Sequence, residues 1–184
     1  MSVHTYTDRD LRAIDEHQNL VCVLSQDLRR DNSMATAGAA VELIDALYAA
    51  GALACKCETG GVAHGARYWR RYAQRLRSAD DAERAQTLYR AFVRRPLDDE
   101  GVLYTAGMHS LGFPDIDYLG PRDLLAATAL IDAVGRSVLA GDPQGLPHSV
   151  CTRYPMDAFL YNPYGVLRID KSRADRSRRS PGAR

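Results

Sequence analysis

Residues 101–120 have the sequence Gly101-Val-Leu-Tyr-Thr-Ala-Gly-Met-His-Ser-Leu-Gly-Phe-Pro-Asp-Ile-Asp-Tyr-Leu-Gly120, around which the rest of the chain can be arranged. The β-branched, aromatic and apolar residues of 102–106 predict one strand and those of 114–118 predict a second, with a glycine-rich turn between them. Pro114 has no N–H to donate and must therefore lie at the start or the edge of its strand. Gly120-Pro121 predicts the start of a helix, because proline is well tolerated at the first helical position. This stretch thus predicts a hairpin followed by a helix.

The first 57 residues predict a parallel crossover. Residues 20–24, Leu-Val-Cys-Val-Leu, are continuously apolar, which is typical of a central strand covered on both faces. Apolar residues at helical spacing predict a helix that begins at Ser33 and ends at Gly51. Residues 52–57 predict another strand. Strand, helix and strand in this order favour a right-handed βαβ unit at the start of the fold.

Two further helices and several short strands complete the predicted fold. Residues 66–76 place their apolar side chains on one helical face, and so do residues 85–92, which follow a capping sequence at 78–81. Short strands are predicted at 149–153, 158–161 and 166–169. We therefore expect one α+β domain over residues 1–170, with helices packed on a mixed sheet of five or six strands. Residues 171–184 are rich in Arg and Ser with almost nothing to bury, and we expect a disordered tail there.

The composition is that of a soluble protein. The chain has 184 residues, 46% of them hydrophobic and 26% charged, which is enough to bury a core in one domain. No apolar run is long enough to cross a bilayer, and the N-terminus lacks the features of a signal peptide. We therefore expect a cytoplasmic protein that does not bind membranes. The cysteines Cys22, Cys55, Cys57 and Cys151 match no metal-binding pattern, so we expect buried, reduced thiols.

Charge is distributed unevenly along the chain. Residues 67–95 contain nine arginines and three acidic residues, a net charge of +6, and residues 171–184 contain six basic residues and one acid, a net charge of +5. Because the whole chain has a net charge of +1, the remainder carries −10. A surface divided in this way favours association with an oppositely charged partner. The tail lacks aromatic residues and a nucleic-acid-binding fold, so nucleic acid is not the expected partner.

Polar residues flank two glycine-rich turns. Glu58, Thr59 and His64 belong to the turn region at 57–65, while His109 and Asp115 belong to the hairpin. Ligands of open sheets bind at the carboxyl ends of strands, so the two turns line one cleft if they lie side by side.

This polar set allows two kinds of chemistry. Glu58, His64, His109 and Asp115 can hold a divalent metal that activates water, or they can act as acid and base. Each also has a structural interpretation, such as His64 in the first turn of a helix, Asp115 pinning a turn and Glu58 paired with an arginine. The spacing matches no established metal, nucleotide or nucleophile signature. We therefore assign no catalytic residue and expect neither a metal nor a cofactor.

The predicted helix at 66–76 combines arginines with aromatic residues. Arg67, Arg70 and Arg71 are neighbours of Trp69, and Trp, Tyr and Arg dominate the hot spots of protein interfaces. The same spacing also allows Trp69 to lie in the core, with the arginines on a solvated face. These four residues and Thr59 are the candidate binding residues.

Two short segments carry a resemblance. Tyr104-Thr-Ala-Gly-Met108 and Gly112-Phe-Pro-Asp-Ile116 are similar to the Y-T-x-G-[LM] … G-x-P-[DE]-[IL] hairpin of a family of uncharacterised bacterial domains of unknown function. Residues 56–64 also look like the glycine-rich turn of one group of these domains. The resemblance covers about a quarter of the chain. It implies a compact α+β fold of bacterial type and transfers no catalytic residues.

Taken together, these features favour a non-catalytic protein that binds another protein, of the immunity or adaptor type. The reasons are the small size, the lack of a catalytic signature and the segregated charge. The alternative is a small enzyme or ligand-binding domain with a cleft lined by Glu58, His64, His109 and Asp115. We expect a protein partner, and neither a membrane nor nucleic acid; a homodimer is also left open.

Overall fold

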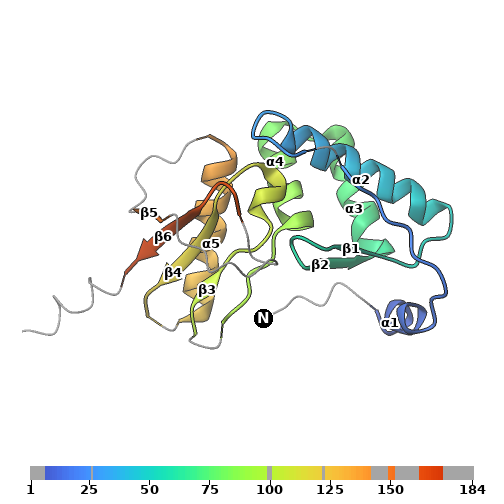
Figure 1. The fold of residues 1–184 in the computed structure, drawn as a ribbon, viewed down its shortest axis with the longest axis horizontal. Coiled ribbons are helices and arrows are strands. Elements are labelled where there is room, and N and C mark those ends of the chain that lie inside the picture. Colours follow the sequence, from blue (N-terminus) through green and yellow to red (C-terminus); the bar gives the residue numbers. More distant parts are fainter. Residues whose placement is uncertain are drawn as a thin grey trace, which may run out of the picture.

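The chain forms an α+β protein with two small sheets instead of one large sheet (Figure 1). The computed structural model describes residues 7–25, 27–98, 101–121, 123–141, 149–151 and 162–171. Within these residues one sheet has two strands, and the other has four in the order β3-β4-β6-β5. The α+β class is therefore confirmed, whereas the predicted single sheet of five or six strands is not seen among the described residues. No helix in the described part is both long and apolar enough to cross a membrane.

The predicted hairpin belongs to the larger sheet. β3 (Leu103–Tyr104) pairs antiparallel with β4 (Asp115–Leu119), and the short 3-10 helix η1 (Met108–Leu111) lies in the connection between them. Both strands lie inside the residue ranges predicted for them, apart from Leu119 at the end of β4. The hairpin is confirmed.

The helix after the hairpin begins later than predicted. α5 (Leu124–Leu139) starts after Asp123, not at Pro121, because the Asp123 carboxylate accepts the backbone N–H of Leu125 and caps the helix. Its buried residues, among them Ile131, face the larger sheet, and Figure 1 shows α5 lying across that sheet.

Two more strands complete the larger sheet. β6 (Val166–Asp170) pairs parallel with β4, and β5 (Ser149–Cys151) pairs antiparallel with β6, so the strand directions are mixed as predicted. The strand predicted at 158–161 lies outside the described residues. The same holds for the predicted tail, of which only Lys171 is described.

The predicted βαβ unit is absent from the described structure. α2 (Ser33–Ala49) forms where expected, but β1 (Ala54–Cys57) pairs antiparallel with β2 (Val62–Gly65), with Cys55 opposite His64. The four residues between β1 and β2 form a tight turn, so the neighbour of β1 is the next segment of the chain and not an earlier one. His64 therefore lies in a strand and does not begin a helix.

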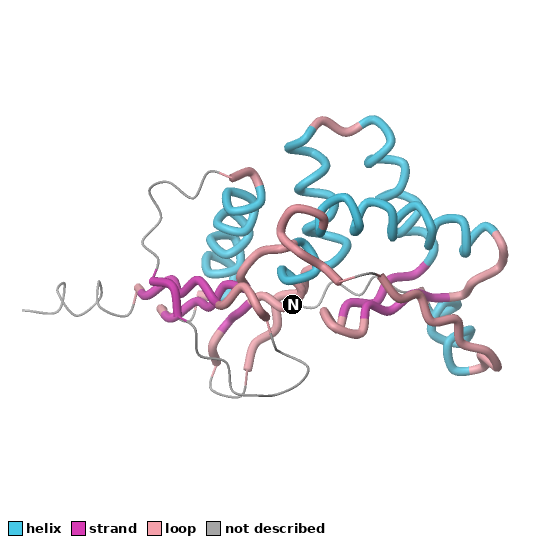
Figure 2. Tube along the Cα trace, turned by 45° about the horizontal axis from the view of Figure 1, so that its top comes forward, coloured by secondary structure: helices cyan, strands magenta, loops and turns pink. Residues whose placement is uncertain are grey.

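α3 (Ala66–Ser78) and α4 (Asp81–Phe92) confirm the two predicted helices. The Asp80 side chain accepts the backbone N–H of Glu83 and caps α4. The buried apolar residues form one cluster that extends from α2 through α3 and α4 to α5 and β6. In Figure 2, α2, α3 and α4 gather toward one end of the molecule, and α5 and the larger sheet toward the other.

Residues 7–25 contribute no buried residue to this core. None of residues 7–25 is buried, neither in α1 (Asp8–Asp15) nor in the extended stretch that follows it. Leu20 is 80% exposed and Leu24 is 91% exposed. The central strand predicted at 20–24 is therefore wrong, because no described strand pairs with this segment and no described element covers it. We call residues 7–25 the N-terminal arm.

Candidate functional site

The two glycine-rich turns meet in the structure. Gly60 lies in the turn between β1 and β2, Gly107 precedes η1, and both approach the carbonyl oxygen of Phe92. A Cβ on Gly60 would lie 2.9 Å from that oxygen and 3.4 Å from the Cα of Gly107. Gly107 has a φ of +115°, in the region that favours glycine. The expected juxtaposition of the turns is therefore present, as close backbone packing.

Glu58 and Thr59 lie on the exposed side of this contact. The Glu58 carboxylate is 3.0 Å from the Lys56 ammonium, and both side chains are exposed, so this pair contributes little to stability. The Thr59 hydroxyl lies 3.6 Å from the Cys57 sulfur. Glu58 thus pairs with a lysine of its own hairpin and not with an arginine of the following helix.

The cysteines of the described part differ in exposure. Cys55 and Cys57 are free and half-buried, and Cys22 is free and exposed, so the expectation of a buried thiol is wrong for Cys22. Burial raises the pKa of the Cys55 thiol to about 11, and the nearby Cys57 adds to this effect. The Cys55 thiol is therefore poorly nucleophilic near neutral pH.

His64 is enclosed between helices. Its Nε2 lies 2.9 Å from the carbonyl oxygen of Ala91, and its ring packs against Trp69 and Tyr72 with centroid distances of 5.7 and 5.3 Å. Nδ1 is buried without a hydrogen-bond partner among the described residues. Burial lowers the pKa of His64, and the hydrogen bond to Ala91 opposes that effect only in part. These contacts make His64 a neutral histidine that joins β2 to α4.

This environment predicts an acid-sensitive fold. The folded-state pKa of His64 lies below its ordinary value of 6.5, so its stability contribution is complete above that pH and is lost as pH falls toward the folded-state pKa. We expect the contribution of this residue to the free energy of unfolding to decrease as the pH is lowered from 7.5 to 5. Chemical denaturation of the wild type and of His64→Gln, whose amide can still reach Ala91, measures the effect. An identical pH dependence of the two proteins would contradict it.

Asp115 is the centre of a buried polar cluster. Its Oδ1 accepts the Thr105 hydroxyl at 3.0 Å and the Met108 backbone N–H at 3.1 Å, and its Oδ2 accepts the Asn162 amide at 2.7 Å. Thr105 in turn accepts the backbone N–H of Ile116 at 2.8 Å. The carboxylate therefore ties the end of β3, the start of η1 and the turn before β6 to one point.

His109 lies beside this cluster. Its Nδ1 is 3.9 Å from Asp115 Oδ2, and its Nε2 is buried without a partner among the described residues. Of the four candidates for catalysis, the structure brings only His109 and Asp115 into contact. Glu58 is paired at the surface, and His64 is enclosed by α3 and α4. Within the described part, no group of three or more His, Cys, Asp or Glu side chains could hold a metal ion.

The arginines of α3 form a surface of one sign. Arg67, Arg70, Arg71 and Arg75 are exposed, and α4 adds Arg90 beside them. We call these five residues the arginine face. Burial raises the pKa of Tyr72, whereas the charges of Arg90, Arg75 and Arg71 oppose this effect. Guanidinium groups from two helices therefore act on one hydroxyl.

Acidic residues of α2 neutralise one flank of α3, and the other arginines of α3 have no ion-pair partner among the described residues. Arg77 lies 2.8 Å from Glu42 and 2.7 Å from Asp45, both on α2. No residue of the arginine face has an ion-pair partner within the described ranges. Trp69 does not belong to this surface, because it is buried and donates its Nε1–H to the Val41 carbonyl at 2.9 Å.

Three residues of these sites do not follow from sequence patterns. Thr105 and Asn162 reach Asp115 from separate segments, and Asn162 is 47 positions away from it, so no local spacing announces the contact. Arg90 reaches the arginine face only because α4 packs against α3. Arg75 is different, since it lies four positions after Arg71 and helical periodicity is sufficient to find it.

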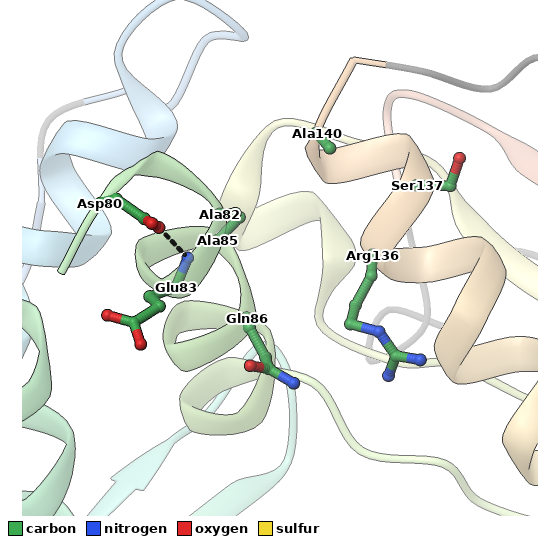
Figure 3. Close-up of a pocket in the computed structure, with 8 residues that line it drawn as sticks. All are labelled: Asp80, Ala82, Glu83, Ala85, Gln86, Arg136, Ser137 and Ala140. Carbon is green, nitrogen blue, oxygen red and sulfur yellow. Dashed lines mark hydrogen bonds between the residues drawn. The ribbon is translucent and has the colours of Figure 1, made fainter.

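A shallow pocket of about 410 Å³ lies between α4 and α5 (Figure 3). Gln86 from α4 and Arg136 from α5 project into the space between the two helices. Asp80 also lines it but is engaged in capping α4. None of the residues singled out from the sequence lines this pocket.

No protein family matches the chain, and neither a curated protein nor a solved structure matches it. The resemblance of the hairpin to uncharacterised bacterial domains therefore stays a prediction.

Proposed function

We propose that this chain is a non-catalytic binding protein, of the immunity or adaptor type, whose arginine face binds an acidic surface of another protein. The observation that carries the proposal is the arginine face itself, five exposed guanidinium groups without a described counter-charge. Grouped charges of one sign raise the association rate with an oppositely charged partner and disfavour wrong partners. Arginine also binds carboxylates in a bidentate manner, which adds specificity to the attraction.

Two further observations favour a protein over nucleic acid. The tryptophan and one tyrosine of α3, Trp69 and Tyr72, are buried, so they offer no ring on which a base could stack. The residues from Arg67 to Arg75 span about 12 Å of helix, which suits an acidic patch better than a long phosphate backbone.

Charge reversal on α3 tests the proposal. With the full chain as bait in extracts of its native host, we expect a specific partner that is released at high salt. Arg71→Glu with Arg75→Glu should lower the affinity for the purified partner about 30-fold or more, because two attractive contacts become repulsive. Calorimetry at two ionic strengths gives the affinity and its salt dependence.

The control is Arg136→Glu, a single charge reversal on an exposed residue of α5, compared with Arg71→Glu alone, which makes the same charge change on the arginine face. The Arg136→Glu variant should bind as the wild type does. Equal losses for Arg71→Glu and Arg136→Glu would show that only net charge matters and would contradict the proposed face. Tighter binding of a DNA oligonucleotide than of the captured protein would contradict a protein partner.

The alternative function, a small enzyme or ligand-binding domain, has less support. It now depends on His109 and Asp115, because Glu58 and His64 make their contacts elsewhere. The Asp115 carboxylate is already occupied by three donors, which favours a structural role for it.

A further inference from the structure

The N-terminal arm is well formed and yet unpacked. The Thr7 hydroxyl accepts the Asp10 backbone N–H, and the Asp10 carboxylate accepts the Thr7 backbone N–H, a complete capping box for α1. No residue of the arm is buried, however, and Figure 1 shows α1 away from the other helices. A capped amphipathic helix whose apolar residues are exposed or only half-buried has much of its apolar side available to another surface.

Residues 20–24 have the properties of a strand without a sheet. Side chains of an extended segment alternate between its two faces, and here both faces are apolar, with Leu20 and Leu24 on one and Val21 and Val23 on the other. No backbone hydrogen bond of these residues is formed within the described part of the chain. An exposed edge of this kind is a template for pairing with another strand.

The sequence of residues 20–24 is palindromic. Leu20-Val21-Cys22-Val23-Leu24 has the same order in both directions around Cys22. Two such segments that pair antiparallel about a twofold axis through Cys22 place Leu20 of each copy opposite Leu24 of the other, and Val21 opposite Val23. Twofold interfaces require a surface that is complementary to itself, and this segment meets that requirement at every position.

From exposure, apolar faces and sequence symmetry together, we propose that two copies of this chain dimerise by antiparallel pairing of residues 20–24 about Cys22. Residues 17–25 contain no Asp, Glu, Lys or Arg, so the two copies meet without charge repulsion. A two-stranded ribbon alone is marginally stable in water. Each copy also supplies α1, whose Leu11 is 47% exposed and whose Ile14 is half-buried, to cover one face of the ribbon.

Matched substitutions test the register. Sedimentation velocity of the full chain should show a dimer that dissociates on dilution below about 100 μM. Leu20→Asp with Leu24→Asp sets like charges opposite each other and should weaken the dimer about 100-fold or more. Leu20→Asp with Leu24→Lys removes the same two leucines but places opposite charges across from each other. Its dimer should be roughly tenfold tighter than that of the double Asp variant. Both positions are exposed, so the fold should be unaffected in circular dichroism.

A thiol cross-linker tests the axis. The proposed pairing sets the two Cys22 residues opposite each other, so a short bismaleimide should link them into a covalent dimer. Cys22→Ser should abolish the link and keep the non-covalent dimer, whereas Cys57→Ser should leave both unchanged.

Three outcomes would overturn the proposal. One is a protein that stays monomeric at every concentration. If its Cys22 also resists thiol reagents, the arm packs on its own chain. Another is a dimer that both double variants weaken equally. The last is a dimer that high salt or Arg71→Glu with Arg75→Glu dissolves, since that result assigns the contact to the arginine face. A dimer held by apolar residues 20–24 should not dissociate at high salt. The dimer and the binding function of the arginine face can therefore be confirmed or contradicted separately.

Discussion

Gly107→Ala will unfold the protein at a denaturant concentration far below that of the wild type. The backbone at position 107 has a φ of +115°, which an L-residue adopts only with strain, and the added methyl group would collide with the Phe92 carbonyl oxygen. That oxygen is backbone at the end of α4 and cannot turn away as a side chain can. We expect a loss of about 4 kcal/mol in the free energy of unfolding, measured by chemical denaturation.

Gly51→Ala is the matched control for this prediction. Gly51 has a φ of +107°, close to that of Gly107, but no atom lies within 4 Å of the position a Cβ would take. This variant therefore has the backbone strain without the collision, and it should lose only about 1 kcal/mol. If both variants lost the same free energy of unfolding, the close approach of the turn to Phe92 would not contribute to stability. The contact between the two glycine-rich turns would then not matter for the fold.

Asp115→Ala is expected to be comparably severe. The change leaves the Thr105 hydroxyl and the Met108 backbone N–H buried without their acceptor, while the Asn162 amide keeps only its second acceptor, the Phe113 carbonyl. Each buried donor that loses its acceptor costs about 1 to 3 kcal/mol, so we expect a total loss of about 4 kcal/mol. Thermal and chemical denaturation measure it.

Asp115→Asn separates hydrogen bonding from the loss of the side chain. The amide oxygen can still accept from Thr105 and Met108, while the amide nitrogen faces the Asn162 donor in place of Oδ2. The free energy of unfolding of this variant should fall by about 1 to 2 kcal/mol, the cost of two N–H donors that face each other. A wild-type stability for Asp115→Ala would show that the cluster does not hold the hairpin, and it would restore the case for a functional carboxylate.

The local elements of this protein could be predicted well from its sequence. α2, α3 and α4 follow apolar periodicity, to which α4 adds the capping residue Asp80, and the β3–β4 hairpin follows its glycines and Pro114. These signals act over a few residues, where steric and hydrogen-bonding preferences of the backbone operate directly. The helix start at Pro121 was misplaced because two cues competed, and the side-chain cap of Asp123 prevailed.

The candidate site was predicted in part. The two glycine-rich turns do come together, and His109 does lie beside Asp115. His64 lies apart from His109 and Asp115. It belongs to β2, which pairs with β1, and its ring packs against Trp69 and Tyr72. Strand pairing joins distant residues, so neither propensity nor periodicity specifies it.

Local patterns along the chain are sufficient to predict the helices, the hairpin, the separation of charge and the apolar character of residues 20–24. Which surfaces stay uncovered depends on packing: α2 neutralises one flank of α3 through Arg77, the arginine face has no ion-pair partner among the described residues, and the N-terminal arm stays off the core. Burial depends on the neighbours of a segment. An apolar pattern indicates how much apolar surface a segment would bury. Whether that surface is buried within the same chain depends on how the other elements pack against it.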